Sequence, residues 1–251
     1  MPNKALTDAE QHWEAVFSEG IRGDYGRVRY PGDDDPVLPG LNAALAHFGD
    51  VRGKTVLDVG CGNGGTSLFF AREGANVIAT DISQAAIDNL KAFCDEHGIP
   101  DVTPVRIPAQ EISSLGPVDF VFGSMILHHI EPFQEFAATL RGLLPAGGRA
   151  FFFENNARSE LMIWFRENVV GRYGIPKFGD DEEFPLTPAE VGMLRRHFQV
   201  EQVYPTLHFF QMIPQYLLRG KLEAPFLALD RFFYRFPRVR QYSYRQFVYL
   251  S

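Results

Sequence analysis

The chain has 251 residues, 45% of them hydrophobic, with a formal net charge of −7 and a pI near 5.5. This acidic balance argues against nucleic acid as a partner, and two cysteines are too few for a disulfide framework, which favours a reducing compartment. The sequence shows neither an apolar signal core nor a run of about 18–20 apolar residues, so we expect a cytoplasmic chain with one domain, residues 1–251, and no transmembrane segment.

Residues 1–48 precede the first predicted strand and contain one clear helix signal. Thr7 as the N-cap and Glu10 at the third helical position form a capping-box pattern, which predicts a helix over Thr7–Ser18. Trp13 and Phe17, four residues apart, share one face of this helix, as the core face of a helix would. The stretch that follows, as far as Gly40, is rich in Gly, Pro and Asp and predicts a loop.

Residues 50–156 alternate between apolar strands and helical segments. Strands are predicted near 55–59, 76–80, 102–106, 118–123 and 149–154. This alternation predicts an α/β fold with a doubly wound, mostly parallel sheet. Right-handed crossovers place the carboxyl ends of the strands on one face, where ligands bind. The polar residues at or just beyond these ends are Asp58, Asp81, Gln110, Ser124, His128 and Glu154.

The first of these strands runs into a glycine-rich turn, VLDVGCGNGGTS (Val56–Ser67). Its glycines satisfy G-x-G-x-x-G, and Asp81 follows Gly60 by 21 positions at the end of the second strand. Glycines let the backbone turn tightly beside a ligand, and an acidic side chain there can accept hydrogen bonds from a ribose diol. Two very different cofactors use this geometry, so a dinucleotide-dependent oxidoreductase is one of the alternatives.

Five ordered segments distinguish the alternatives: VLDVGCGNGGTS, VIATDIS, IPAQEI, VDFVFGSMILHHI and LRGLLPAGGRAFFFE. They resemble the motifs of the class I S-adenosylmethionine-dependent methyltransferases, in which an acidic residue before G-x-G-x-G lies near the methionine end of the cofactor. Ala146 departs from the usual L-x-P-G-G turn. The resemblance spans residues 50–156 and implies a Rossmann-like methyltransferase fold with seven strands. The cofactor-binding residues that it implies are Asp58, Gly60, Cys61, Gly62, Gly64, Asp81, Ile82, Ala109, Gln110 and Ser124.

The same resemblance implies that residues 1–48 form a helical lid over the cofactor. Trp13, Phe17, Tyr25 and Tyr30 are then candidate lid residues, and Tyr25 is a candidate substrate contact.

Residues 157–251 are predicted to form the substrate side of the domain. A helix over Ala157–Val170 is apolar around much of its circumference and carries Trp164, a candidate substrate contact. Thr187, followed by proline and Glu190, predicts the start of another helix.

Strands are predicted at Phe198–Pro205 and Arg240–Leu250, with a helical insertion, 206–239, between them. Seven basic residues against two acidic ones give residues 212–251 a local charge of +5. Interleaved aromatic and cationic side chains suit either peripheral contact with lipid or a hairpin that closes the substrate pocket.

Two histidines and a glutamate are the candidate catalytic residues. Methyl transfer to a hydroxyl needs a base, and histidine, with an unperturbed pKa near 6.5, suits proton removal at neutral pH. His128 and His129 are therefore candidate bases, although either could instead be structural. Glu154 either orients the histidine, holds a substrate group, or simply marks the strand exit.

The leading hypothesis is a methyltransferase that uses S-adenosylmethionine and acts on a hydroxyl of a small apolar or glycosidic metabolite. The fourth strand lacks the [DN]-P-P-[FYW] exit of enzymes that methylate amino groups, and no metal-ligand spacing is evident. N- or C-methylation on the same scaffold is the nearest alternative. An NAD(P)-dependent oxidoreductase, which lacks an evident Tyr-x-x-x-Lys, and a non-catalytic binding protein are the others.

Overall fold

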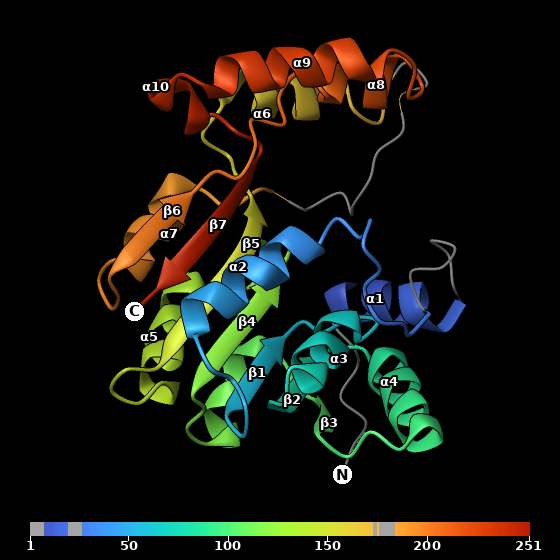
Figure 1. Ribbon diagram of the computed structural model, residues 1–251, viewed down its shortest axis with the longest axis vertical. Helices are drawn as coiled ribbons and strands as arrows, with labels where there is room; N and C mark the ends of the chain where they lie inside the picture. Colours follow the sequence, from blue (N-terminus) through green and yellow to red (C-terminus); the bar gives the residue numbers. More distant parts are fainter. Residues whose placement is uncertain (1–7, 20–26, 173–174, 176–183) are drawn as a thin grey trace.

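The computed structural model describes residues 8–19, 27–172, 175 and 184–251 (Figure 1). These residues form a seven-stranded sheet in the order β3-β2-β1-β4-β5-β7-β6, in which β7 runs in the opposite direction to the other strands. The strands are β1 (Thr55–Val59), β2 (Asn76–Asp81), β3 (Val102–Arg106), β4 (Phe120–Ser124), β5 (Arg149–Asn155), β6 (Val200–Val203) and β7 (Arg245–Leu250). The predicted α/β fold with a mostly parallel sheet is confirmed.

Helices cover both faces of the sheet and its carboxyl edge. They are α1 (Asp8–Glu19), α2 (Leu38–Phe48), α3 (Gly65–Arg72), α4 (Gln84–His97), η2 (Ala109–Leu115), η3 (Leu127–His129), α5 (Phe133–Leu143), α6 (Glu160–Asn168), α7 (Pro188–Leu194), α8 (Met212–Leu217), α9 (Glu223–Tyr234) and α10 (Pro237–Arg240). No helix in the described ranges is long and apolar enough to cross a bilayer.

The core lies on the two faces of the sheet because strand side chains alternate between them. Phe122 and Phe151 belong to the cluster under α2 and α3, whereas Val121 and Phe152 belong to the cluster under α5 and α7. All four side chains are fully buried. Burial on both faces explains why these strands read as apolar runs in the sequence.

The α2 helix was not predicted, since its first turn contains Pro39 and Gly40 and its N-cap, Val37, makes no side-chain cap bond. Tertiary packing stabilises it instead. Leu41 and Ala44 are fully buried, and a Cβ at Gly40 would lie 3.1 Å from the Phe153 ring. Glycine therefore lets the helix approach β5 closely, overriding its low helix propensity.

The C-terminal elements are confirmed with shifted boundaries. The predicted Thr187 capping box is present at the start of α7. The last strand begins at Arg245 rather than at Arg240, because residues 237–240 form α10. The predicted insertion forms α8, α9 and α10, and with α6 these helices make a separate layer beyond the carboxyl end of β5 (Figure 1, top).

Candidate functional site

The glycine turn after β1 begins the candidate site. Gly60, Gly62 and Gly64 have φ angles of +70°, +52° and +76°, a region that residues with a Cβ rarely adopt. Gly65, the last glycine of the G-x-G-x-x-G pattern, already lies in α3. The three glycines of the turn itself are therefore those of the G-x-G-x-G pattern. A Cβ at Gly64 would lie 2.4 Å from Leu90, so the turn also depends on close packing against α4.

Asp81, at the end of β2, faces this turn. One carboxylate oxygen accepts the N–H of Gly62 at 2.9 Å, and the other accepts the N–H of Ser83 at 2.9 Å. Burial raises the pKa of Asp81, and these two N–H donors act against that rise. A carboxylate has about four acceptor sites, so two hydrogen bonds leave capacity for hydroxyl donors from a ligand.

Asp58, at the end of β1, turns toward the start of α3. Its Oδ2 accepts the hydroxyls of Thr66 and Ser67, each at 2.6 Å. Burial raises the pKa of Asp58 to about 6, which the two hydroxyls partly offset. Asp58 therefore fixes the glycine turn to the helix that follows it. Thr66 and Ser67 had no predicted role, although they belong to the quoted motif.

The α1 helix lies across the strand ends. Glu14 accepts hydrogen bonds from the Ser83 hydroxyl at 2.9 Å and from the N–H of Ala85 at 3.2 Å, at the N-terminus of α4. The ring of Phe17 lies 3.3 Å from the position of a Cβ at Gly62. Phe17 is buried, as the core face of a helix would be, and it also contacts the glycine turn. The role of α1 as a lid over the cofactor stays a prediction. No sequence signal marked Glu14 as its anchor.

A buried glutamate–histidine pair joins the ends of β4 and β5. Glu154 Oε2 lies 2.6 Å from Nδ1 of His128, and the two side chains are 0% and 1% exposed. Glu154 Oε1 accepts the N–H groups of Ile126 and Leu127 at 2.8 and 2.7 Å. Since all three contacts converge on one carboxylate, its position is fixed by the backbone of the neighbouring strand exit.

His129 lies between this pair and α1. Its ring centroid is 4.1 Å from that of His128 and 5.5 Å from that of Trp13, which it meets edge to face. The two histidines and the α1 helix therefore form one continuous contact at the carboxyl end of β4. The structure thus brings the three candidate catalytic residues His128, His129 and Glu154 together.

The other predicted site residues occupy varied positions. Ile82 and Ser124 are half-buried at strand exits, and Ala109 lies in η2. Gln110 is exposed and its amide donates to the Glu131 carbonyl at 2.8 Å. Burial raises the pKa of the Cys61 thiol, so this residue stays a neutral part of the turn.

Of the two predicted substrate contacts, the structure describes only Trp164. Tyr25 falls outside the described residues. Trp164 is 56% exposed on α6, so its role in substrate binding stays a prediction. No group of three or more potential metal ligands occurs among the residues that the structure describes.

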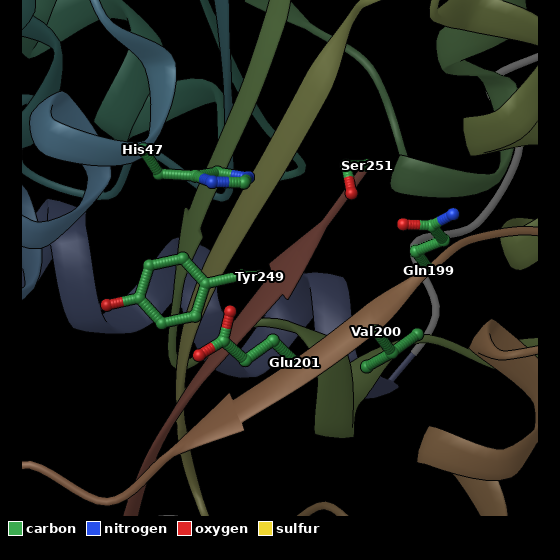
Figure 2. Close-up of a pocket in the computed structure, with 6 residues that line it drawn as sticks. All are labelled: His47, Gln199, Val200, Glu201, Tyr249 and Ser251. Atoms are coloured by element: carbon green, nitrogen blue, oxygen red, sulfur yellow. The ribbon is translucent and has the colours of Figure 1, made fainter.

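A surface pocket lies at the opposite end of the sheet. Its lining residues are His47, Gln199, Val200, Glu201, Tyr249 and Ser251 (Figure 2). It adjoins the start of β6 and the end of β7. Because β7 is antiparallel, its end lies beside the amino ends of the parallel strands. Ligands of such sheets bind at the carboxyl ends of the parallel strands, so the glycine turn and the histidine pair, rather than this pocket, form the candidate site.

Comparison with known proteins agrees with this geometry. A family model described as a methyltransferase domain matches residues 56–148. A ubiquinone biosynthesis O-methyltransferase of Acinetobacter baylyi is 26% identical over 193 residues, covering 75% of this chain and 81% of that protein. Its counterpart in Rickettsia felis is 30% identical over 154 residues, covering 60% and 62%. The structure of geranyl diphosphate C-methyltransferase from Streptomyces coelicolor A3(2) is similar in fold, with a TM-score of 0.62 over 98% of each chain and 15% identity.

The sheet order and the glycine turn define a Rossmann-like enzyme that binds a nucleotide cofactor. The chain belongs to the class I S-adenosylmethionine-dependent methyltransferases, and S-adenosylmethionine is its cofactor. This assignment selects the methyltransferase over the dinucleotide-dependent oxidoreductase.

Proposed function

We propose that this methyltransferase methylates a hydroxyl group of a small apolar or glycosidic metabolite, with His128 as the base. The contact between Glu154 and Nδ1 of His128 carries the proposal. A hydroxyl must lose its proton as the methyl group arrives, and a histidine held by a carboxylate is suited to take it.

The residues at the strand ends fit S-adenosylmethionine. The glycine turn lets the backbone approach a ligand closely, and Asp81 retains acceptor sites for the two ribose hydroxyls. Asp58 adds negative charge beside the turn, which suits the cationic sulfonium. We assign Ile82, Ala109 and Gln110 to the adenine and Cys61 and Ser124 to the walls of the same site. When bound, S-adenosylmethionine supplies an electrophilic methyl group.

Glu154 is a positioning residue in this proposal. Because its Oε2 faces Nδ1 of His128, the proton of the neutral imidazole belongs on Nδ1 and the lone pair on Nε2. Nε2 is then the atom that accepts the hydroxyl proton. The carboxylate also stabilises the imidazolium that results, as in other histidine–carboxylate pairs.

The α1 helix is expected to control access to this base. The His128 side chain is 1% exposed. Its ring packs against that of His129, which in turn meets Trp13 of α1, so we expect an acceptor to reach Nε2 only after the side chains that cover it move. Closure afterwards would exclude water and hold the acceptor in line with the methyl group. Trp164 and Tyr25 remain proposed substrate contacts.

O-methylation is favoured over N- or C-methylation. The relatives from Acinetobacter baylyi and Rickettsia felis bear the name of O-methyltransferases, and a neutral amine would need no strong base. Identification of the methylated atom in the product by NMR tests this choice.

Single substitutions test the base. A panel of phenols, catechols and glycosides is first screened for methyl transfer. The rates of H128A and H129A are then compared with wild type between pH 6 and 9, and binding of S-adenosylhomocysteine is measured by calorimetry. We expect H128A to lose about 10²–10⁴-fold in kcat while still binding S-adenosylhomocysteine. If neither variant slows turnover at any pH, the histidine base is wrong.

A further inference from the structure

One face of α9 is apolar and points away from the rest of the protein. Leu229, Phe232 and Phe236 are 41%, 51% and 50% exposed, and Pro225 and Ala228 are exposed as well. Their spacing places these five residues on one side of the helix and its C-terminal end. We call this set the α9 outer face. Large apolar side chains grouped in this way on a surface mark an interaction site.

The opposite face of α9 is anchored, so the helix cannot bury its outer face by rotating. Asp230 is 2% exposed, and its carboxylate accepts the N–H groups of Phe209, Phe210 and Gln211 at 3.0, 2.9 and 3.1 Å. The Phe233 ring packs against that of Phe210, with centroids 5.3 Å apart.

The exposed charged residues close to the α9 outer face in the sequence are mostly cationic. Glu223 is the one exposed acidic residue in 212–251, since Asp230, the other acidic residue there, is buried. The exposed cations of the same region are Arg219, Lys221, Arg231, Arg235 and Arg238. The chain as a whole carries −7, so positive charge is concentrated where the apolar side chains are exposed.

We propose that the α9 outer face binds the surface of a bilayer that contains anionic lipids. Phe232, Phe236 and Leu229 would enter the boundary between headgroups and acyl chains, while the arginines contact lipid phosphates. A helix with an apolar face flanked by Lys and Arg lies in the plane of such a surface. Each cation near an anionic surface strengthens binding about fivefold.

The same charges disfavour a second copy of the chain as the occupant. In a symmetric dimer, the α9 outer faces would meet each other and bring the arginines of both copies together. Like charges that face each other across an interface weaken association. Anionic lipid, in contrast, complements both the apolar stripe and the charge around it.

The location of α9 connects this surface with the catalytic domain. The layer of α6, α8, α9 and α10 lies beyond the carboxyl end of β5 (Figure 1), the edge that carries Glu154 and His128. A protein resting on a bilayer through α9 would therefore have its strand ends turned toward the membrane. The proposal does not depend on which atom is methylated or on which residue is the base.

Sedimentation with vesicles tests the proposal. The full-length protein is mixed with sucrose-loaded vesicles of phosphatidylcholine alone or of phosphatidylcholine with phosphatidylglycerol. We expect binding to the anionic vesicles that weakens in high salt, since salt screens the charges. R231Q/R235Q should lower the partition coefficient about 30-fold, and F232S/F236S should lower it about tenfold or more.

Matched controls are R196Q and F184S, which alter an exposed arginine and an exposed phenylalanine elsewhere on the surface. Both should bind vesicles as wild type does. An unchanged melting temperature and an unchanged affinity for S-adenosylhomocysteine show that a variant is folded. If F232S/F236S does not fold, R231Q/R235Q alone tests the proposal. The proposal is overturned if wild type ignores anionic vesicles, or if R196Q weakens binding as much as R231Q/R235Q. It is equally overturned if wild type forms a dimer that F232S/F236S abolishes and binds no vesicles.

Discussion

Replacing Glu154 by glutamine changes a few atoms at the centre of the proposed mechanism. The wild-type carboxylate accepts the N–H groups of Ile126 and Leu127 through one oxygen and faces Nδ1 of His128 with the other. In E154Q the amide oxygen can keep both backbone contacts. The amide nitrogen then faces Nδ1, and since it is a donor, it favours the histidine tautomer with its proton on Nε2.

The magnitudes follow from this exchange. With Nε2 protonated, His128 has no lone pair for the acceptor hydroxyl, so we expect kcat to fall about 10²–10⁴-fold. Exchanging charged hydrogen bonds for neutral ones should lower the free energy of unfolding by only about 1–3 kcal/mol. E154A, in contrast, leaves two buried N–H groups and the imidazole without an acceptor and should cost at least about 3 kcal/mol.

Two assays separate catalysis from stability. Urea unfolding gives the free energies, and methyl transfer between pH 6 and 9 gives the rates. In E154Q the midpoint of the pH–rate profile should move, because an imidazolium loses its neighbouring carboxylate; a purely structural role would leave the profile unchanged in shape. Turnover of E154Q at the wild-type rate would refute the assignment of Glu154 and His128 as a pair.

Three further predictions concern the cofactor side of the site. Burial raises the pKa of Asp58 from 3.8 to about 6, so the folded state holds this proton more tightly than the unfolded chain. The contribution of Asp58 to the free energy of unfolding is therefore fully present below pH 4, and about 3 kcal/mol of it is lost as the pH rises through 6. When the free energy of unfolding is measured in urea at several pH values, D58N should show a smaller decrease over this pH range than wild type. G64A places a Cβ 2.4 Å from Leu90 at a backbone φ of +76°, so it should lower the free energy of unfolding by about 2 kcal/mol or more. The control is G192A, where nothing lies within 4 Å of the added Cβ, and it should be neutral or slightly stabilising. D81N should weaken S-adenosylhomocysteine binding about 10–100-fold by calorimetry, and an unchanged Kd would remove Asp81 from the ribose site.

The positions of the strands along the chain and the glycine turn could be predicted from the sequence because their causes are local. Strands buried on both faces read as apolar runs, and tight turns such as the one at Gly60, Gly62 and Gly64 need glycine whatever surrounds them. Residues at the carboxyl ends of parallel strands must share one edge of the sheet. The proximity of His128 to Glu154 follows from this rule.

Contacts between elements distant in the chain were decided only by the tertiary structure. The α2 helix forms despite Pro39 and Gly40 because its burial against β5 outweighs their low propensity. Glu14 reaches Ser83 across 69 residues, a contact that no local pattern encodes. The outward direction of the α9 outer face likewise depends on Asp230 binding the start of α8. The sequence determines which residues can serve a given role, but which of them meet depends on packing over long separations.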